Sequence, residues 1–108
     1  MSEPIAYAPT QPSREEIDAL AGLTLLEFGA PWCPHCQAAQ APLAAALAGR
    51  ADIRLLKFED GPGRPLGRSF RVKLWPTLIL LKDGQELARR VRPTRVEEMA
   101  ELLAAARG

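Results

Sequence analysis

Two cysteines three positions apart, Cys33 and Cys36, are the only cysteines of the chain, and the stretch FGAPWCPHC that holds them also holds its only histidine, His35. At the start of a helix, residues three apart lie on one face, so the two sulfurs can form a disulfide. A helix N-terminus also has unpaired N–H groups and a positive potential, which stabilise a thiolate and lower the pKa of Cys33. Cys36 lies one turn deeper, where we expect it to be shielded. The pattern therefore favours a redox pair in which Cys33 attacks a disulfide and Cys36 resolves the mixed disulfide.

Other uses of the pair fit the sequence less well. A zinc site usually needs four ligands, whereas this chain offers two cysteines and one histidine, and His35 lies between the cysteines, where it cannot easily bind the same ion. A haem-attachment motif needs a histidine directly after the second cysteine, where this chain has Gln37. A purely structural disulfide would close too short a loop to remove much entropy from the unfolded chain. We therefore expect no metal or organic cofactor, with a metal-binding module as the last alternative.

The composition is that of one globular domain without a strongly charged partner. Of the 108 residues, 47% are hydrophobic and 25% are charged, and the net charge of +1 gives no reason to expect a nucleic acid or a membrane as partner. The N-terminal segment, MSEPIAYAPTQPSREE, has neither the basic start nor the apolar core of a signal peptide. We therefore expect a cytoplasmic protein, where a lone cysteine pair is more often catalytic or metal-binding than structural.

The chain divides into a short arm and one domain. Residues 1–12 are polar and hold three prolines, so we interpret them as a flexible arm before a single domain over 13–108. Apolar periodicity, prolines and glycines predict the elements of that domain in chain order: a helix over 14–21, a buried strand over 23–30, a helix over 33–48, a strand over 53–59, a short helix near 66–71, strands over 77–82 and 85–91, and a helix over 95–106.

Local motifs mark the ends of these elements. Ser13 and Glu16 fit a capping box at the first helix, and Thr94 and Glu97 fit a second one at the last helix. The Asp-Gly pair at 83–84 predicts a tight hairpin. Because strands joined through helices are parallel and a hairpin adds antiparallel strands, we expect an α/β domain with a mixed sheet.

Two motifs resemble those of the thioredoxin family. FGAPWCPHC is similar to the thioredoxin segment that ends in Trp-Cys-Gly-Pro-Cys, and WPTLILLKDGQE, residues 75–86, is similar to the Pro-Thr strand and hairpin of that family. The 39 residues between Cys36 and Pro76 match the family spacing closely, and the resemblance covers roughly residues 13–107. It implies the thioredoxin fold, in which a parallel βαβ unit and a C-terminal hairpin form a mixed sheet with helices on both faces.

The resemblance also implies further site residues beside an exposed nucleophilic cysteine. Pro76 would be a cis-proline packed against the disulfide, and the backbone of Trp75 would pair with an extended segment of the substrate. Trp32 would shape the rim of the site, and Thr77, in the Pro-Thr motif, is counted with the substrate-binding residues. Arg92 stands where thioredoxins normally have a glycine beside the active-site surface, so we count it as substrate-binding too.

Glu27 stands six residues before Cys33, where thioredoxins usually carry a buried aspartate. Inside an apolar strand its carboxyl group would have a raised pKa, and it could take the proton of Cys36 directly or through water. Lys57 aligns with a lysine that thioredoxins place near that acid. The alternatives are an edge position for Glu27 and a solvated strand end for Lys57.

The dipeptide Pro34-His35 departs from the Gly-Pro of thioredoxins and is that of the periplasmic disulfide oxidase DsbA. His35 can stabilise the Cys33 thiolate by a hydrogen bond or, when protonated, by its charge. Stabilising the reduced form would make the disulfide more oxidising. The alternative is an exposed histidine without effect.

The resemblance implies a thiol–disulfide oxidoreductase that exchanges electrons between Cys33/Cys36 and protein disulfides or dithiols. We expect a monomeric disulfide reductase fed by a thioredoxin reductase or a glutathione system. A more oxidising oxidase or isomerase, glutathione-linked exchange, and a non-catalytic binding or redox-sensing module remain alternatives. Between residues 61 and 95 there are nine Lys or Arg against two Asp or Glu, which is either a solvated basic surface or a preference for acidic partners.

Overall fold

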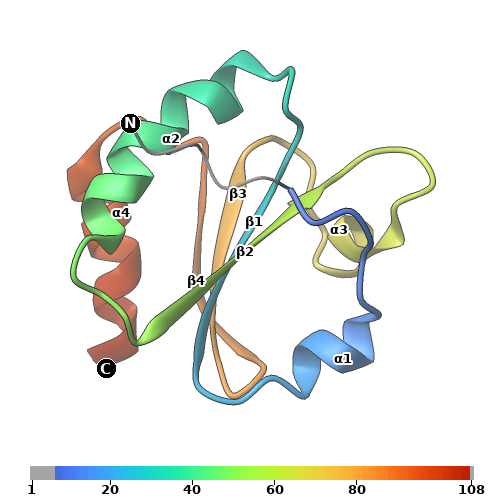
Figure 1. Cartoon of the computed structure of the whole chain (residues 1–108), viewed down its shortest axis with the longest axis horizontal. Helices are drawn as coiled ribbons and strands as arrows, with labels where there is room; N and C mark the ends of the chain where they lie inside the picture. The colour runs from blue at the N-terminus through green and yellow to red at the C-terminus, as the bar shows by residue number, and fades with distance from the viewer. Residues whose placement is uncertain (1–6, 108) are drawn as a thin grey trace.

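The structure is a computed structural model that describes residues 7–107 of the chain (Figure 1). Its elements in chain order are α1 (Arg14–Asp18), β1 (Leu23–Gly29), α2 (Pro34–Leu47), β2 (Ile53–Glu59), α3 (Pro65–Ser69), β3 (Thr77–Lys82), β4 (Gln85–Val91), α4 (Val96–Ala104) and the 3₁₀ turn η1 (Ala105–Arg107). Every helix and strand predicted from the sequence is present, in the predicted order. Part of the predicted arm, residues 1–6, lies outside the described residues.

Four strands form one mixed sheet in the order β2-β1-β3-β4. β1 pairs parallel with β2 and antiparallel with β3, and β3 pairs antiparallel with β4. The central position of β1 explains why LTLLEFG is almost continuously apolar, because every residue from Thr24 to Gly29 is buried. The predicted fold, a parallel βαβ unit followed by a hairpin in one mixed sheet, is confirmed.

Helices cover both faces of the sheet, with α2 and α4 on one side and α1 and α3 on the other (Figure 1). Because side chains alternate along a strand, β1 points Leu25 and Glu27 toward α2, and Leu26 and Phe28 toward the opposite face. Each face has its own apolar core. Among residues 7–107, no helix is long and apolar enough to span a membrane.

The hairpin between β3 and β4 turns at Asp83 and Gly84, whose φ angles are 50° and 81°. Two successive positive φ angles form the type I′ turn that the Asp-Gly pair predicts. Gly84 has a second reason to be glycine, since a Cβ there would collide with the backbone carbonyl of Asp18. The Asp83 carboxylate accepts the Gly22 N–H at 2.7 Å, which ties the hairpin to the loop that enters β1.

The two predicted capping boxes have different outcomes. At α1, Ser13 and Glu16 exchange both hydrogen bonds of the box, as predicted. At α4 the predicted pair is wrong, because Arg95 rather than Thr94 is the N-cap, and Glu98 rather than Glu97 accepts the Arg95 N–H at 3.2 Å. The Glu98 carboxylate also accepts the Thr94 N–H at 3.0 Å, so one carboxylate holds two consecutive backbone donors.

Residues 7–12 of the predicted arm lie alongside β2. The Ala8 N–H donates to the Lys57 carbonyl at 2.9 Å, and the Gln11 side chain donates to the Glu59 carbonyl at 2.8 Å. This part of the arm is therefore attached to the sheet by backbone and side-chain hydrogen bonds. The division of the whole chain into an arm and a domain remains a proposal.

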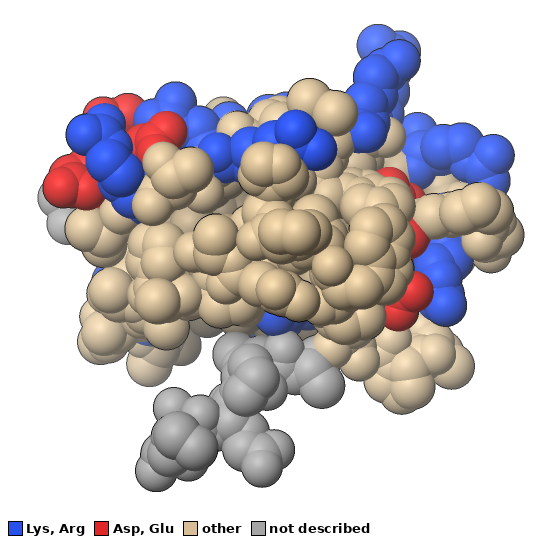
Figure 2. Space-filling model, turned by 90° about the horizontal axis from the view of Figure 1, so that it is seen from above, with Lys and Arg blue, Asp and Glu red and all other residues tan. Residues whose placement is uncertain are grey.

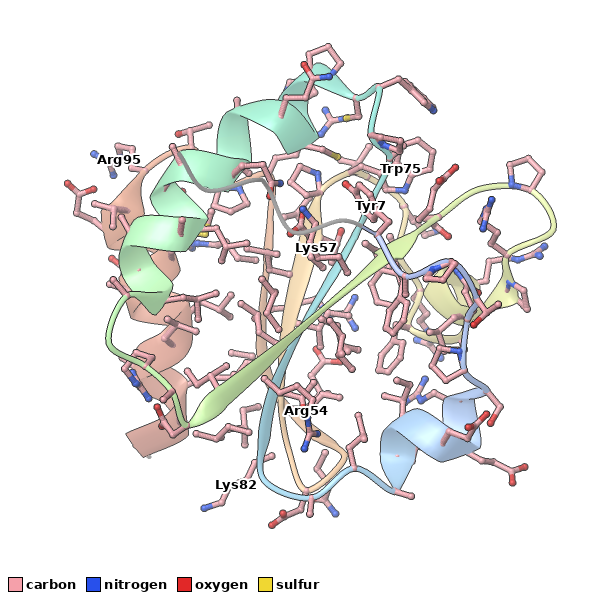
Figure 3. The ribbon with its side chains drawn as sticks, in the orientation of Figure 1. Tyr7, Arg54, Lys57, Trp75, Lys82 and Arg95 are labelled. Atoms are coloured by element: carbon pink, nitrogen blue, oxygen red, sulfur yellow. The ribbon has the colours of Figure 1, made fainter. Side chains whose placement is uncertain are left out.

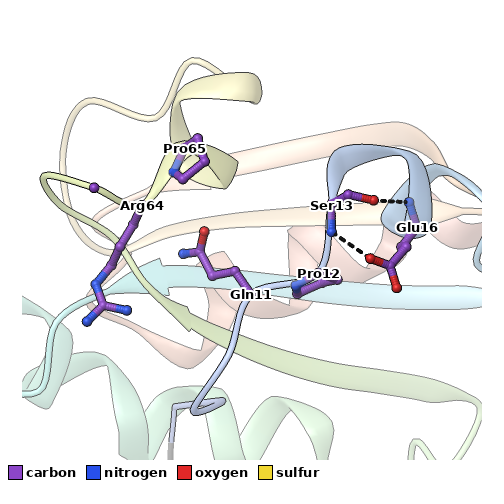
Figure 4. Close-up of a pocket in the computed structure, with 7 residues that line it drawn as sticks. Gln11, Pro12, Ser13, Glu16, Arg64 and Pro65 are labelled. Atoms are coloured by element: carbon purple, nitrogen blue, oxygen red, sulfur yellow. Dashed lines mark hydrogen bonds between the residues drawn. The ribbon is translucent and has the colours of Figure 1, made fainter.

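A pocket lies between this part of the arm, the start of α1 and the loop before α3 (Figure 4). It is lined by Gln11, Pro12, Ser13, Glu16, Gly63, Arg64 and Pro65. The polar groups of Ser13 and Glu16 are used in the capping box of α1. None of the predicted site residues lines this pocket.

Candidate active site

The cysteine pair lies at the junction of β1 and α2. Cys33 is the N-cap of α2 in an extended conformation, and Pro34 occupies the first helical turn, where its missing N–H costs little. The Gln37 N–H donates to the Cys33 carbonyl at 3.0 Å and closes the first turn, which contains Cys36. Both cysteines are free thiols, and in the described part of the chain no group of three or more His, Cys, Asp or Glu side chains is arranged to hold a metal ion. The predicted position of the pair at a helix start is confirmed.

Both thiols lie below the surface. Cys36 is 1% exposed, as predicted, but Cys33 is only 5% exposed, so the expectation of an exposed nucleophile is wrong for this conformation. The reason is Trp75, which packs against the cluster of Cys33, Cys36 and Ala30. Both sulfurs are therefore shielded from solvent in this structure.

The surroundings of Cys33 favour its thiolate. Burial opposes ionisation, but hydrogen bonds from the Cys36 thiol and from the backbone N–H groups of Cys36 and His35 outweigh it. The positive charge of Arg92 adds to these hydrogen bonds, and the pKa of the Cys33 thiol is lowered. A low thiol pKa is what the helix start predicts.

His35 acts on Cys33 through its backbone. The residue is exposed, and its backbone N–H, rather than its imidazole, is the group that stabilises the Cys33 thiolate. The side-chain charge acting on Cys33 belongs to Arg92. The effect expected of the His35 imidazole stays a prediction, and Arg92 supplies the positive charge in this structure.

Cys36 is held as a neutral thiol. Burial raises the pKa of Cys36, a hydrogen bond from the Ala30 backbone partly opposes it, and the neighbouring Cys33 and Glu27 add to the rise, so that the pKa is about 11. The absence of a side chain at Gly29 makes room for this thiol, because a Cβ there would lie 2.6 Å from the Cys36 Sγ. Cys36 therefore needs a base before it can act as a nucleophile.

A buried polar network connects Cys36 to Glu27. Glu27 and Lys57 are register partners on β1 and β2, and the Lys57 Nζ lies 3.7 Å from the Glu27 Oε1. Gln40 of α2 joins them, since its Nε2 donates to the Glu27 Oε2 at 2.9 Å and its Oε1 accepts from the Lys57 Nζ at 2.7 Å. The same Nε2 donates to the Cys36 carbonyl at 2.8 Å. Glu27 is 0% and Lys57 5% exposed, so the alternatives of an edge acid and a solvated lysine are wrong.

The Glu27 carboxyl group is suited to accept a proton. Burial raises the pKa of Glu27, and the charge of Lys57 and the hydrogen bond from Gln40 offset this only in part. Its Oε2 accepts from Gln40, whereas its Oε1 is buried and has no hydrogen-bond partner among the described residues. A carboxylate with a raised pKa and one oxygen without a hydrogen bond can accept a proton as a general base.

The peptide bond between Trp75 and Pro76 is cis, as the resemblance implies, and Pro76 is buried. The Trp75 indole Nε1 donates to the Asp60 Oδ2 at 2.9 Å, which fixes the ring beside the cysteines. Trp32, which is 67% exposed, stands edge-on to Trp75 with 5.6 Å between ring centroids. The two indoles therefore form one wall at the mouth of the site.

Arg92 covers the backbone of Trp75. Its Nε donates to the Trp75 carbonyl at 2.9 Å, and its own N–H donates to the Pro76 carbonyl at 2.9 Å. Its φ angle of 51° lies in the left-handed region that favours glycine, the residue that the resemblance expects here. The carbonyl expected to pair with a substrate is therefore occupied by a side chain of the same protein.

Thr77 does not face the site. It is 1% exposed, and its hydroxyl donates to the Leu74 carbonyl at 2.6 Å. The Thr77 side chain is therefore not available to a substrate in this structure, and substrate binding by Thr77 stays a prediction. Its hydrogen bond instead supports the loop that carries Trp75 and Pro76.

Large apolar side chains are exposed next to the site residues. Trp32, Leu74 and Val91 are 67%, 49% and 45% exposed, and each is a sequence neighbour of Cys33, Trp75 or Arg92. Figure 2, which looks down on the end of the molecule where α2 begins, shows a broad area without charged residues and a row of basic side chains along one edge. An apolar patch with a polar border is typical of a protein-docking surface.

Three residues around the cysteines were missed in the sequence. Gln40 follows Cys36 by four positions and so lies on the same helix face, a spacing that could have pointed to it. Asp60 directly follows β2, and its N–H donates to the Gly29 carbonyl at 2.8 Å, so it lies at the same sheet edge as the cysteines. Tyr7 comes from the arm, and no sequence pattern indicated its place.

Comparisons with known proteins identify similar chains and structures. The thioredoxin family model matches residues 7–105. The structure resembles that of thioredoxin 2 from Pseudomonas aeruginosa PAO1 in its reduced form, with a TM-score of 0.85 and 50% sequence identity over 98% of this chain and 96% of that chain.

Curated relatives include proteins of different lengths. A thioredoxin of Chlamydia trachomatis serovar D is 40% identical over 76 residues, which are 68% of this chain and 74% of that protein. Protein disulfide-isomerase A2 of Pongo abelii is 44% identical over 64 residues, which are 56% of this chain and 12% of that protein. The chain thus spans a small part of the isomerase and most of the bacterial thioredoxin.

Proposed function

The chain belongs to the thioredoxin family and is a thiol–disulfide oxidoreductase, and we propose that it acts as a protein disulfide reductase. The observation that carries this proposal is the unequal pair, in which the pKa of Cys33 is lowered and the pKa of Cys36 is raised to about 11. The ionised Cys33 thiol can attack a disulfide directly, whereas the neutral Cys36 thiol becomes a nucleophile only after a base removes its proton. The similarity to bacterial thioredoxins supports the reductive direction.

In the first step the Cys33 thiolate attacks one sulfur of a substrate disulfide. A bond forms between the Cys33 sulfur and that substrate sulfur, while the substrate disulfide breaks and its second sulfur leaves as a thiolate. The product is a mixed disulfide between protein and substrate. The helix N-terminus and Arg92 stabilise the Cys33 thiolate before the attack, and a protonated His35 would add to this effect.

In the second step Cys36 gives its proton to the Glu27 carboxylate, directly or through water, and attacks the Cys33 sulfur. The Cys33–Cys36 disulfide forms, and the first substrate sulfur leaves as a thiolate, so the substrate has gained two electrons and the pair has lost two. A thioredoxin reductase or a glutathione system returns the pair to the dithiol. The cycle requires no metal or organic cofactor bound to the protein.

Substrate docking is assigned to the surface around Trp75 and cis-Pro76. Trp32 and Trp75 offer apolar area beside Cys33, and an extended substrate segment can pair with the Trp75 backbone. Because the Trp75 carbonyl is held by Arg92 at 2.9 Å, that hydrogen bond has to open or be shared when the segment binds. Arg92 then lies free beside the substrate, where it favours an acidic side chain.

Arg92→Glu is expected to reverse the charge preference among substrates. The variant loses the positive charge near Cys33, so the pKa of that thiol rises and attack at pH 7 slows, most strongly for acidic disulfide peptides. Rates with an acidic and a basic disulfide peptide of equal length measure the preference. Arg95→Glu is the matched control, since it makes the same change of net charge at an exposed residue that has no hydrogen bond to the Trp75 carbonyl. An unchanged ratio of the two rates in Arg92→Glu contradicts this role.

A second function, disulfide oxidation or isomerisation, is favoured by the stabilised Cys33 thiolate and by the Pro34-His35 dipeptide. A more stable dithiol makes the disulfide a stronger oxidant, and about 30 mV changes the equilibrium tenfold. Titration of the pair in glutathione buffers separates the two functions. We expect a value near the roughly −270 mV of a thioredoxin, whereas a value near the roughly −120 mV of DsbA would overturn the reductase assignment.

The compartment, the oligomeric state and the reductant are proposed on the basis of the same assignment. We propose a cytoplasmic monomer that acts on protein disulfides and is re-reduced by a thioredoxin reductase. Turnover measured with either a thioredoxin reductase or glutathione as the only reductant distinguishes this from glutathione-linked recycling. A very slow insulin-reduction rate with a normally reactive Cys33 would instead indicate a binding or redox-sensing module.

A further inference from the structure

Tyr7 brings a hydroxyl group to the resolving thiol. A Cβ built at Gly29 would lie 2.6 Å from the Cys36 Sγ and 3.1 Å from the Tyr7 Oη, so both atoms border the small space left by that glycine. The Tyr7 hydroxyl and the Cys36 sulfur are therefore close neighbours, and Cys36 acts on the ionisation of that hydroxyl. The absence of a side chain at Gly29 therefore leaves room for the hydroxyl of Tyr7, a residue of the arm, beside the Cys36 sulfur.

The position of Tyr7 is held on two sides. The N-H of the next residue, Ala8, donates to the Lys57 carbonyl at 2.9 Å and fixes the backbone to β2. The Lys57 Nζ lies 4.8 Å from the centroid of the Tyr7 ring, a cation–π contact with a lysine that is itself only 5% exposed. In Figure 3 the labelled Tyr7 and Lys57 lie together, with Trp75 close by.

The charged groups that face this hydroxyl decide its role. Glu27 of β1 and the two cysteine sulfurs of α2 are the acidic groups around it, and Lys57 of β2 is the cation beneath its ring. Burial and the nearby Glu27 and Cys36 raise the pKa of Tyr7 well above its ordinary range. The phenol therefore keeps its proton near neutral pH and can donate a hydrogen bond to an anion beside it.

We propose that Tyr7 is a catalytic residue of the resolving step, in which its hydroxyl donates a hydrogen bond to the Cys36 sulfur as that sulfur becomes a thiolate. The proposal rests on the assignment of Cys36 as the resolving thiol. Glu27 takes the Cys36 proton, the Cys36 sulfur attacks Cys33, and the substrate sulfur leaves as a thiolate. Tyr7 exchanges no proton or electron in this step and releases its hydrogen bond when the disulfide has formed.

The expected size of the effect follows from thiol reactivity. A thiol whose pKa falls by one unit has about ten times more thiolate below that pKa, but the thiolate is about threefold less nucleophilic. The net gain is about threefold for each unit. Removing the Tyr7 hydroxyl should therefore slow the resolving step about three- to tenfold at pH 7, without slowing the attack by Cys33.

Tyr7→Phe tests this directly, because it keeps the ring over Lys57 and removes only the hydroxyl. The full chain is mixed with excess 5,5′-dithiobis(2-nitrobenzoate) in a stopped-flow instrument, where attack by Cys33 releases one nitrothiolate and resolution by Cys36 releases a second. We expect an unchanged first phase, a slower second phase, and a second-phase pH profile displaced to higher pH. An unchanged second phase, or equal slowing of both phases, overturns the proposal.

Two further measurements separate the hydroxyl from the ring. Tyr7→Leu removes both, so it should match Tyr7→Phe in the second phase, and slowing confined to Tyr7→Leu would assign the effect to packing and overturn the proposal. Tyr7 is the only tyrosine of the chain, so growth on 3-fluorotyrosine makes this one hydroxyl a stronger donor. The second phase of the 3-fluorotyrosine protein should then be faster than that of Tyr7→Phe. The ratio of these two rates should be at least as large as the ratio between the wild type and Tyr7→Phe. A wild-type protein that releases only one nitrothiolate would instead refute Cys36 as the resolving thiol.

Discussion

Serine in place of Cys33 is expected to abolish disulfide reduction, with a fall in rate of about 10³-fold or more. The attacking group is the thiolate whose pKa is lowered by hydrogen bonds around the α2 start and by Arg92, and a hydroxyl group remains protonated in the same place. Serine fills nearly the same volume, so the folded structure should be kept. Insulin reduction with dithiothreitol as electron source measures the loss, and full turnover by Cys33→Ser would refute the assignment of the nucleophile.

Cys36→Ser is the matched variant, and it should fail one step later. Cys33 still attacks, but no second thiol displaces the substrate, so the mixed disulfide accumulates. Mass spectrometry of the protein after incubation with a disulfide peptide should detect one covalently bound peptide per chain, released by excess reductant. Cys33→Ser is inactive, whereas Cys36→Ser stops at the mixed disulfide. This difference assigns the attack to Cys33 and the resolution to Cys36.

Glu27→Gln should slow reduction and stabilise the reduced protein at neutral pH. The amide keeps the shape of the buried carboxyl group but cannot take the Cys36 proton, so the resolving step slows by about 10²-fold, the lower end of what a general base contributes. The loss should appear in the second phase of the nitrothiolate assay. Glu97→Gln, at an exposed carboxylate on α4, is the control and should leave both phases unchanged.

The stability gain of Glu27→Gln has a defined pH dependence. Burial raises the pKa of Glu27 above its ordinary value of 4.5, so the folded protein holds that proton more tightly than the unfolded chain does. Wild-type stability is therefore kept below pH 4.5 and lost as pH rises through the raised folded pKa, while glutamine stays neutral throughout. The variant should exceed the wild type at pH 8 by about 1.4 kcal/mol for each unit of the shift, and should match it at pH 4. Equal urea midpoints at pH 8 would contradict a buried, destabilised carboxylate.

The fold could be predicted because its signals are local. The apolar run of β1, the Asp83-Gly84 turn and the Ser13 capping box each depend on a few neighbouring residues, and the connections between strands leave few ways to join them. The second capping box failed because it also depends on where the loop after β4 ends. Thr94 stands only one position from the true N-cap, Arg95, an offset that sequence patterns do not resolve.

The site could be predicted as far as its motifs extend. Cys33, Cys36, Glu27 and Pro76 stand at spacings set by the fold, and the structure brings them together, although Cys33 is buried rather than exposed. Apart from Gln40, which follows Cys36 by four positions, the partners of these residues come from distant parts of the chain, so no spacing encodes them. The hydrogen bond from Arg92 to the Trp75 carbonyl and the inward turn of the Thr77 hydroxyl are decided by tertiary packing.

The edge-on contact of the two indoles gives the protein an optical property. Trp32 and Trp75 are the only tryptophans of the chain, and their ring centroids are 5.6 Å apart beside the cysteine pair. All of its tryptophan fluorescence therefore originates beside the cysteine pair, where Trp75 also borders the apolar core on the α1 and α3 face. Because a disulfide quenches a nearby indole more strongly than thiols do, the emission intensity reports the oxidation state of Cys33 and Cys36 without any added label.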